Sequence, residues 1–434
     1  SSSNGSDTDS ESEDYSNYQS VKDSISNSLK KIYITREHRN IMGQGKVSIL
    51  PMIVSNFLQY DTTLCFEKGE GNFLKSGHRC LLRYGVEKTL NNNQTFVACI
   101  ADAYCKYNNV EKTISVREFK KMLIENFTID NFISCNNGNL THIFLSKNID
   151  DDFFEKMDIA ETYKSSNFYS NLNMENINQV NLYKKIINSY ENFQKYLNSK
   201  HHIIDHTYLW DIVSKPNGFL FKDGINLIIL DITSEDITQN IKVLCPKSSY
   251  SNQFIDANKL NLILIKNNNI YEPIYAIKDT SMEKRVVSLF SFDYEKDEIY
   301  LLEFKRVLNI LKDDLNERCI KNNNIEKYDF ETNITLNNLI KILDRLKYEI
   351  LYQIMNYENK IIGVMVSYNG NSNGFLIPCF PSEIDNEKSL DLKFMDDGEI
   401  QYNNYQDTKM FLEKIYEDSK HKIKVNPKYK ILED

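Results

Sequence analysis

The stretch from Gly77 to Tyr107, GHRCLLRYGVEKTLNNNQTFVACIADAYCKY, constrains the fold more than any other part of the sequence. A basic and apolar lead-in is followed by a polar turn at Asn91 to Asn93 and by a helix that we predict to begin near Thr95. Apolar residues at spacings of three and four give this helix one stripe that faces a core. A hydrolase would place its nucleophile at such a helix start, where free backbone N–H groups and the positive end of the helix dipole gather. The stripe consists of Phe96, Ile100, Ala103, Tyr104 and Tyr107.

Length and charge bound the class of protein. A chain of 434 residues is long enough for two to three domains with sizeable cores. The net charge is -9, and the first 14 residues contribute -5 of it through five acidic residues without a base. We therefore predict that residues 1–28 are a disordered acidic linker. Because the remaining body is mildly acidic, any contact with nucleic acid has to come from local basic patches. The five acidic residues are Asp7, Asp9, Glu11, Glu13 and Asp14.

The cysteine pattern predicts an intracellular protein. The eight cysteines contain no C-x-x-C pair and several lie in apolar stretches, so we expect reduced core residues rather than a disulfide framework or a zinc site. No apolar run approaches the roughly 20 residues of a membrane span, and no signal peptide is recognisable. The linker-like start and the abrupt end suggest an internal piece of a longer protein. The cysteines are Cys65, Cys80, Cys99, Cys105, Cys135, Cys245, Cys319 and Cys379.

Two further motifs are candidates for ligand sites, one for a nucleotide and one for a metal ion. Gly43 and Gly45 resemble half of a nucleotide fingerprint, but no third glycine follows at the right spacing, so we expect a tight turn before a short helix that begins at Pro51. The stretch from His201 to His206 holds three histidines and Asp205, and His202 and His206 could share a helical face. Since no remote third ligand is recognisable, a solvated helix cap is the expected role. We predict no metal and no cofactor.

Helices dominate up to Trp210 and strands follow it. Ser115 begins a capping box at the start of one helix, and an amphipathic helix is predicted from about Ile177 to Leu197. Four short apolar runs then read as strands, and Pro273 would place the last of them at a sheet edge or break its ladder. Helices followed by strands indicate an α+β architecture, with a mixed sheet flanked by helices. The runs are 227–232, 241–245, 262–265 and 271–277.

The last third of the chain is predicted to be a smaller α/β unit. Helices are expected at 301–315 and, capped by Thr335, through Ile350. Two strands, 361–366 and 375–377, are joined by Asn-Gly-Asn-Ser-Asn-Gly, which is a strong hairpin signal. A final helix after Asp407 leads into a basic end. Charged residues interrupt the apolar pattern between Asp279 and Glu295, so the expected domains are 29–285 and 286–434.

The order of these elements resembles the ovarian-tumour-type cysteine proteases over roughly residues 77–278. In that family a polar turn presents a cysteine at a helix start, a tryptophan-containing element follows, and a late strand begins with a histidine that acts as the base. Here NNNQTFVACIADAY and NNNIYEPIYAI occupy these places, but Thr95 stands at the cysteine position and Ile270 at the histidine position. A threonine hydroxyl cannot reach the low pKa of an activated thiolate, and no imidazole takes its proton. The resemblance therefore implies a catalytically degenerate, protease-like domain.

A second resemblance covers nearly everything after the tail. Strings such as GQGKVSILPMIVSNFLQY, LWDIVSKPNGFLFKDGINLIILDI and GFLIPCFPSEI are similar to the large subunit of the early transcription factor of nucleocytoplasmic large DNA viruses, in its giant-virus form. This likeness implies a non-catalytic part of a transcription initiation factor. Its partners would be double-stranded promoter DNA, a helicase-like small subunit and the viral RNA polymerase. Its location would be the virion and the cytoplasmic viral factory of the host cell.

Two basic patches are the predicted DNA contacts, since clustered Lys and Arg neutralise phosphates and release counterions. One patch precedes the central helix, and the other lies in a C-terminal stretch of seventeen residues, 414–430, with a net charge of +4. Two other functions stay open: an ovarian-tumour-type deubiquitinase and a pure protein-interaction scaffold. The predicted contact residues are Lys75, His78, Arg79, Arg83 and Lys88 in the first patch, and Lys420, Lys422, Lys424, Lys428 and Lys430 in the second.

Overall fold

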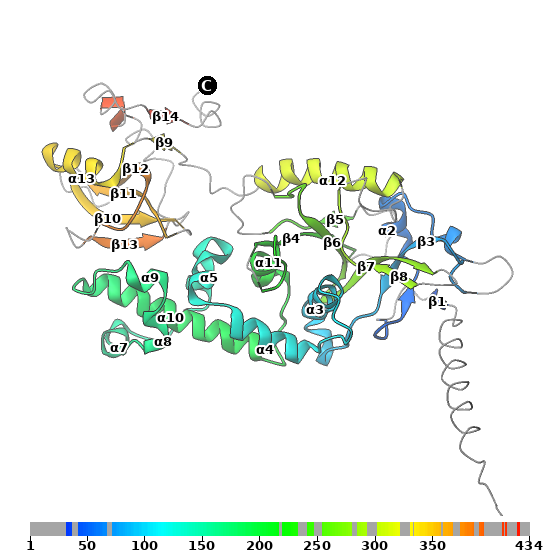
Figure 1. Ribbon diagram of the computed structural model, residues 1–434. Helices are drawn as coiled ribbons and strands as arrows, with labels where there is room; N and C mark the ends of the chain where they lie inside the picture. Colours follow the sequence, from blue (N-terminus) through cyan, green and yellow to red (C-terminus); the bar gives the residue numbers. More distant parts are fainter. Residues whose placement is uncertain are drawn as a thin grey trace, which may run out of the picture. The chain divides into compact units, whose positions relative to one another are not determined.

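The structure is a computed structural model that contains two compact units (Figure 1). Each unit is assembled from three separate stretches of chain, and the boundary expected between residues 285 and 286 lies inside a stretch of unit 1. Unit 1 comprises Ser1–Val116, Val213–Leu244 and Ile255–Asp314, and unit 2 comprises Arg117–Ile212, Cys245–Phe254 and Leu315–Asp434. The described residues are 32–36, 42–66, 72–216, 219–232, 241–246, 254–279, 284–292, 302–321, 330–332, 334–356, 359–367, 374–385, 390–394, 410–411, 413–414 and 423–425.

Unit 1 is built on an eight-stranded mixed sheet with the order β1-β2-β3-β7-β6-β4-β5, in which β8 also pairs with β7. Two neighbouring pairs, β1 with β2 and β4 with β6, are parallel, and the others are antiparallel. The α+β class expected from the sequence is therefore confirmed. The strands are β1 (Ile34–Thr35), β2 (Val47–Ser48), β3 (Arg79–Tyr84), β4 (Ile225–Asp231), β5 (Lys242–Val243), β6 (Leu260–Asn267), β7 (Ile270–Asp279) and β8 (Lys284–Val287).

Strand β7 contains Pro273 and lies inside the sheet, so the expectation of an edge strand is wrong, whereas the expected break of a ladder at Pro273 is observed. β7 pairs with β6 through residues 270–273 and with β3 through residues 274–278. Pro273 stands at the changeover between these two partners, where β3 pairing begins only at Ile274. A residue without an N–H is tolerated there because, among the described strands, none pairs with it on the β3 side.

Helices cover both faces of this sheet. Figure 1 shows α3 (Thr95–Tyr107) against one face and the unit 1 part of α12 (Leu302–Lys321) along the opposite face. Contacts between aromatic rings fasten each layer: Phe96 lies 5.3 Å from Tyr271 of β7, and Phe304 lies 5.2 Å from Phe290, measured between ring centroids. The short helix α2 (Met52–Phe57) follows Pro51, as predicted, and two 3₁₀ helices complete the unit. These are η1 (Thr62–Cys65) and η2 (Leu90–Asn92).

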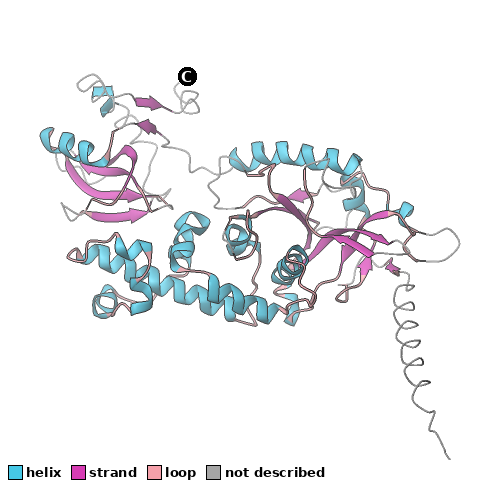
Figure 2. Cartoon of the chain, viewed as in Figure 1, coloured by secondary structure: helices cyan, strands magenta, loops and turns pink. Residues whose placement is uncertain are grey.

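Unit 2 combines a group of helices with a four-stranded sheet (Figure 2). The predicted amphipathic helix is α10, and Ser115 directly precedes α4, which confirms both helix starts. α11 begins in unit 2 and ends in unit 1. The helices are α4 (Val116–Asn126), α5 (Ile129–Ser134), η3 (Cys135–Gly138), α6 (Asn139–Ile143), α7 (Asp151–Lys156), α8 (Glu161–Lys164), α9 (Asn167–Ser170), α10 (Ile177–Asn198), α11 (His206–Ser214) and α13 (Leu336–Arg345).

The sheet of unit 2 has the order β12-β11-β10-β13, and β9 pairs separately with β14. β11 and β12 form the predicted antiparallel hairpin, although its connection, 368–373, lies outside the described residues. The helix that follows Thr335 is shorter than predicted, because Ile350 belongs to β10. The final helix after Asp407 is described only at 410–411 and 413–414. The strands are β9 (Phe330–Thr332), β10 (Glu349–Met355), β11 (Ile361–Ser367), β12 (Phe375–Ser382), β13 (Asp391–Phe394) and β14 (Ile423–Val425).

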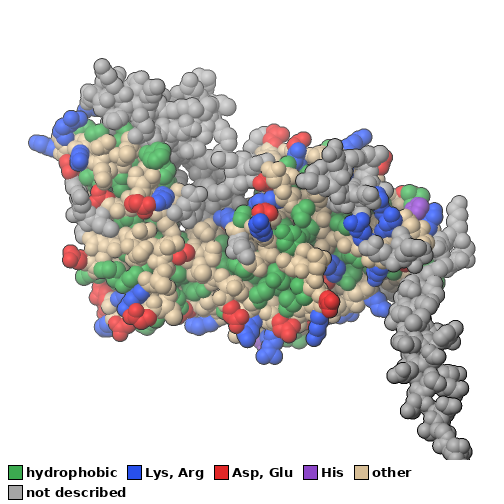
Figure 3. Space-filling view, in the orientation of Figure 1, with side chains coloured by type: hydrophobic (Ala, Val, Ile, Leu, Met, Phe, Trp, Pro, Cys, Tyr) green, Lys and Arg blue, Asp and Glu red, His purple; other side chains and the backbone are tan. Residues whose placement is uncertain are grey.

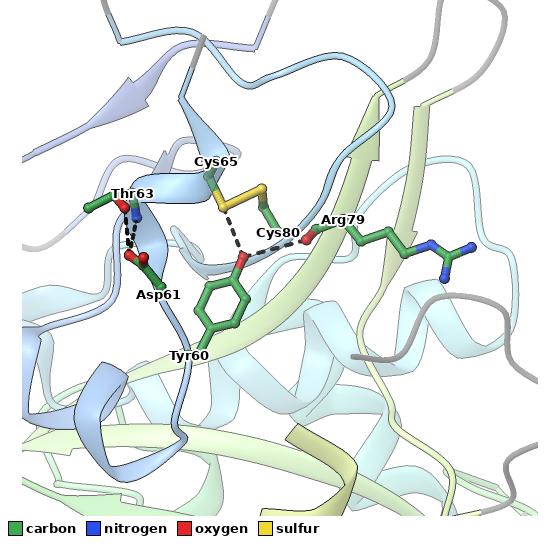
Figure 4. Close-up of a disulfide and its surroundings, with 6 residues drawn as sticks. All are labelled: Tyr60, Asp61, Thr63, Cys65, Arg79 and Cys80. Atoms are coloured by element: carbon green, nitrogen blue, oxygen red, sulfur yellow. Dashed lines mark hydrogen bonds between the residues drawn. A yellow bond between two sulfur atoms is a disulfide. The ribbon is translucent and has the colours of Figure 1, made fainter. Parts of the chain in front are cut away.

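Two disulfides correct the expectation that all cysteines are reduced. Cys65 in η1 is bonded to Cys80 in β3 (Figure 4), and Cys245, just after β5, is bonded to Cys319 in α12. The partners are 15 and 74 residues apart in the sequence, and only the folded chain brings them together. The four other cysteines are free and buried, as expected.

Alkylation under denaturing conditions tests these assignments. The unfolded protein kept without reductant should take up iodoacetamide at four cysteines, because the other four are in disulfides, and at all eight after reduction. Mass spectrometry of the intact chain counts the labels. Eight labels in the unreduced sample would show that the disulfides are absent from the protein in solution.

Candidate nucleic-acid interface

The helix start at Thr95 is a closed structural junction. Thr95 is the first residue of α3, and its side chain is 1% exposed. Its hydroxyl donates a hydrogen bond to the carbonyl oxygen of Asn269 (3.2 Å) and accepts one from the backbone N–H of Tyr271 (2.8 Å). These two residues flank Ile270, so the structure brings together the two positions that were singled out in the sequence.

The hydroxyl of Thr95 completes the backbone pairing of β7. Ahead of Ile274 no described strand of unit 1 pairs with β7 on its β3 side, so the N–H of Tyr271 needs another acceptor. Thr95 supplies that acceptor, and Pro273 has no N–H to satisfy. Because the oxygen is buried and already donates and accepts a hydrogen bond, and Ile270 offers no proton acceptor, this arrangement cannot activate Thr95 as a nucleophile.

The two cysteines of α3 are also poorly suited to catalysis. Cys99 is fully buried, and burial raises the pKa of its thiol well above the ordinary value, with further contributions from Glu272 and Asp102. Cys105 is buried as well, and its sulfur accepts the backbone N–H of Ile114 at 3.4 Å. A reactive cysteine needs a lowered pKa and access to substrate, and Cys99 has neither.

Asp102 is the centre of a buried polar network between α3 and the sheet. Its carboxylate accepts a hydrogen bond from the Tyr275 hydroxyl (2.6 Å) and pairs with Lys106 one helical turn later (2.7 Å). The Lys106 ammonium also lies 4.5 Å from the ring centroid of Tyr84. Burial raises the pKa of Tyr84 to about 12, and burial together with Asp102 raises that of Tyr275 further, so both phenols stay protonated. The network joins the helix to the sheet.

Arg83 does not belong to an exposed basic patch. Its guanidinium forms an ion pair with Glu272 (3.1 Å), and both side chains are buried. Glu272 also accepts the backbone N–H of Met42 at 3.0 Å. Burial raises the pKa of Glu272, and Arg83 opposes that rise. Arg83 therefore contributes a buried contact between β3 and β7, where phosphates have no access.

The other members of the first patch separate into two places. Lys75 is exposed and lies in the loop before β3, His78 and Arg79 are half-buried at the start of the strand, and Lys88 is exposed beyond the other end of β3. The Arg79 side chain extends away from the Cys65–Cys80 disulfide (Figure 4). Lys75, His78 and Arg79 are therefore neighbours along one end of the strand, and Lys88 is not.

The structure adds basic residues that the sequence analysis missed. Arg79 is in register with Lys278 of β7, and Lys278 is in register with Arg285 of β8. In Figure 3, Lys and Arg side chains gather at this end of unit 1. Their sequence signal was the alternating hairpin 270–287, but the pairing of β3 with β7 joins segments about 200 residues apart and cannot be read from local patterns.

Most residues of the second patch lie outside the described part of the chain. Lys424 lies in β14, which pairs with β9. Lys420, Lys422, Lys428 and Lys430 lie outside the described residues. The C-terminal patch therefore stays a prediction from the sequence.

The histidine cluster has the local role of a helix start. Asp205 accepts the backbone N–H of Thr207 at 2.9 Å at the beginning of α11, and His206 packs on Trp210 with ring centroids 5.9 Å apart. His201 and His202 are exposed. Among the described residues, no group of three or more His, Cys, Asp and Glu side chains is placed to hold a metal ion. Over the same residues, no helix is both long and apolar enough to cross a bilayer.

Comparisons with known proteins identify no relative. No protein-family model, no curated protein sequence and no solved structure matches the chain.

Replacing Thr95 tests its role at the junction. Thr95→Val should lower the free energy of unfolding by about 1–3 kcal/mol, because the N–H of Tyr271 is left buried without an acceptor. Thr95→Ser keeps the hydroxyl and is the matched control, with a smaller loss. Urea denaturation followed by circular dichroism measures both. Equal losses for the two variants would show that the hydroxyl is not what matters.

The Arg83–Glu272 pair makes a pH-dependent prediction. Arg83→Met should cost about 3–5 kcal/mol at pH 7, because it leaves a buried carboxylate without its partner. In this variant the folded-state pKa of Glu272 rises further above its ordinary value of 4.5. A raised carboxyl pKa contributes stability below the unfolded-state value that is lost as the pH rises through the folded-state value. The cost should therefore be smaller at pH 4.5 than at pH 7.

The double variant Arg83→Met/Glu272→Met is the control for this pair. It removes both charges and should recover much of the loss at pH 7, because no charge stays buried alone. Urea denaturation at the two pH values measures the three variants against the natural protein. A cost of Arg83→Met that does not change with pH would contradict the assignment.

Proposed function

We propose that this protein is a non-catalytic segment of a viral early transcription initiation factor that binds promoter DNA, the viral RNA polymerase or both. The observation that carries the proposal is the basic segment at the start of β3, with the exposed Lys75 and the half-buried His78 and Arg79, in a chain whose net charge is -9. On an acidic protein, a locally basic surface attracts polyanions to one place, because the rest of the molecule repels them.

The non-catalytic half of the proposal is supported by the closed junction at Thr95. In a degenerate protease-like domain, the positions of the nucleophile and of the base would still lie side by side. Here Thr95 bonds to the backbone on both sides of Ile270. The side chains that remain serve the packing of α3 on β7, and a fold of this kind would act through its surface.

The partners that we propose are double-stranded promoter DNA, a helicase-like ATPase small subunit and the viral RNA polymerase. A place in the virion is compatible with the disulfides Cys65–Cys80 and Cys245–Cys319, since disulfides persist in oxidising surroundings that include virion surfaces. The viral factory in the host cytoplasm is the second proposed location, and there the same four cysteines would be exposed to reducing conditions.

A titration with duplex DNA tests the function. The complete chain should bind a fluorescent duplex at low salt, and the logarithm of the affinity should fall linearly with the logarithm of the salt concentration, by about 0.9 for each phosphate contact. Fluorescence anisotropy between 50 and 200 mM salt measures this slope. Absence of binding to the duplex at low salt would remove DNA from the list of partners and leave the polymerase.

A ubiquitin-based activity probe tests the non-catalytic half. A probe that traps nucleophilic cysteines should leave the folded protein unlabelled, because Cys99 is buried with a raised pKa and Thr95 is already hydrogen-bonded. An active deubiquitinase is the positive control. Covalent capture at Thr95 or at any cysteine would overturn the proposal in favour of the deubiquitinase alternative.

A further inference from the structure

Three basic side chains form one row across the end of the unit 1 sheet. Arg79 of β3 lies opposite Lys278 of β7, and Lys278 lies opposite Arg285 of β8. Residues directly opposite each other in paired strands point to the same face of a sheet. The three side chains, which we call the basic row, therefore stand side by side on one face, although Arg79 precedes the other two by about 200 residues in the sequence.

The basic row has no acidic counterpart in the ladder. On the same face, the next row inward is apolar and consists of Leu81, Ala276 and Val287. The acidic residue nearest in register is Asp279, which follows Lys278 and so points to the opposite face, where it pairs in register with Lys284. The connection 280–283 lies outside the described residues.

Like charges directly opposite each other in a sheet are destabilising, and the basic row contains two such neighbours. Within the described part of the chain, none of the three side chains forms an ion pair that would relieve this repulsion. Arg79 and Lys278 are half-exposed and Arg285 is exposed, so solvent and ligands reach all three. A row that costs stability and faces solvent is suited to an anionic ligand.

The loop before β3 extends the basic row. The backbone N–H of Gly77 donates to the carbonyl oxygen of Asp279 at 2.6 Å, which holds this loop against the end of β7. The loop carries the exposed Lys75, and the disulfide at Cys80 ties the following residue of β3 to η1. Because sheet pairing and a covalent bond fix the backbone on both sides of Arg79, its side chain is presented from a rigid support.

The spacing of the basic row suits the backbone of a duplex. Neighbouring strands lie about 4.8 Å apart, so three strands span roughly 10 Å. A DNA duplex carries one charge per about 1.7 Å of its axis, so about six phosphates lie within that span. The arginines at both ends of the basic row can each donate two parallel hydrogen bonds to one phosphate, which a lysine cannot do.

We propose that the basic row of Arg79, Lys278 and Arg285, extended by Lys75, binds the phosphate backbone of duplex DNA independently of its sequence. This inference rests on the proposed function and adds to it the surface and the mode of contact. Phosphate contacts position a protein on DNA, whereas contacts to base edges specify a sequence. The basic row therefore holds the duplex, and any reading of a promoter takes place elsewhere.

The test compares two triple variants with the same change in charge. The row variant is Arg79→Gln/Lys278→Gln/Arg285→Gln. The control variant is Lys46→Gln/Lys112→Gln/Lys284→Gln, which removes three exposed lysines of unit 1 that lie outside the basic row. Lys284 is the sharpest part of this control, because it is adjacent to Arg285 in β8 but points to the opposite face.

The row variant should lower the slope of log affinity against log salt by about 2.7, which is about 0.9 for each of three contacts. Between 50 and 200 mM salt, the natural protein should then lose affinity by a factor about 40 times larger than the factor for the row variant. The control variant should keep the natural slope. The loss should be the same for two duplexes of unrelated sequence, since the basic row reads no bases.

A conservative variant and a foldedness check keep the result interpretable. Arg79→Lys/Arg285→Lys preserves the charges and should keep most of the slope, with a modest loss of affinity from the missing bidentate contacts. Circular dichroism of each variant shows whether the sheet is intact. A row variant that unfolds is replaced by the single variant Arg285→Gln on β8, with Lys284→Gln as its partner control, and a slope change near 0.9 is then expected.

The outcomes separate the inference from the proposed function. If the natural protein binds the duplex and the row variant keeps its slope, the basic row is not the contact surface and the inference fails, while DNA binding stands. If the natural protein binds no duplex at low salt, the DNA half of the proposed function fails and the inference fails with it. If labelled polyglutamate binds with the affinity and slope of the duplex, the basic row serves an acidic protein partner and the DNA assignment is overturned.

Discussion

Unit 1 depends on the hydrogen bonding of β7, because this strand changes partners halfway along its length. Its first part pairs with β6 and its second part with β3 and β8. Where the partner changes, backbone N–H and C=O groups need hydrogen-bond partners outside the ladder. Pro273 removes one donor at the changeover, and the hydroxyl of Thr95 accepts another, from Tyr271. A buried N–H without an acceptor would cost about 1–3 kcal/mol. The hydrogen bond from Tyr271 to Thr95 therefore helps to fix the start of α3 against β7.

The same strand carries three polar or charged side chains that matter for the unit. Glu272 faces Arg83, Tyr275 reaches Asp102 on α3, and Lys278 stands in the basic row. Successive side chains of a strand point to opposite faces of the sheet. Tyr275 therefore points to the face covered by α3, and Glu272 and Lys278 point to the opposite face. Charges in the middle of the strand are buried and paired, whereas the one at its end faces solvent without a partner in the ladder. That contrast is the reason for assigning a binding role to the end of the strand.

The chemistry of the Thr95 junction agrees with the proposed role of the protein. At the junction the start of a helix meets the beginning of a strand, and the Thr95 hydroxyl is used for two hydrogen bonds to the backbone. Activating a nucleophile at this place would require an exposed group with a lowered pKa, and burial drives the pKa of the neighbouring Cys99 in the opposite direction. This geometry supports our proposal that the protein acts through surface contact, with charge positioned by a rigid sheet.

The sequence by itself determined the elements whose signal is local. The helix from Thr95, the helix start after Ser115, the long helix α10 and the hairpin of β11 and β12 all follow from apolar spacing, caps and turn residues within a few positions. The tertiary structure decided what depends on distant partners: the Cys65–Cys80 and Cys245–Cys319 bonds, the interior place of Pro273, the burial of Arg83 against Glu272, and the alignment of Arg79 with Lys278 and Arg285. A side chain's periodicity shows that it shares a face with its neighbours, but whether that face meets solvent, an acid or another base depends on strands that the chain supplies about 200 residues later.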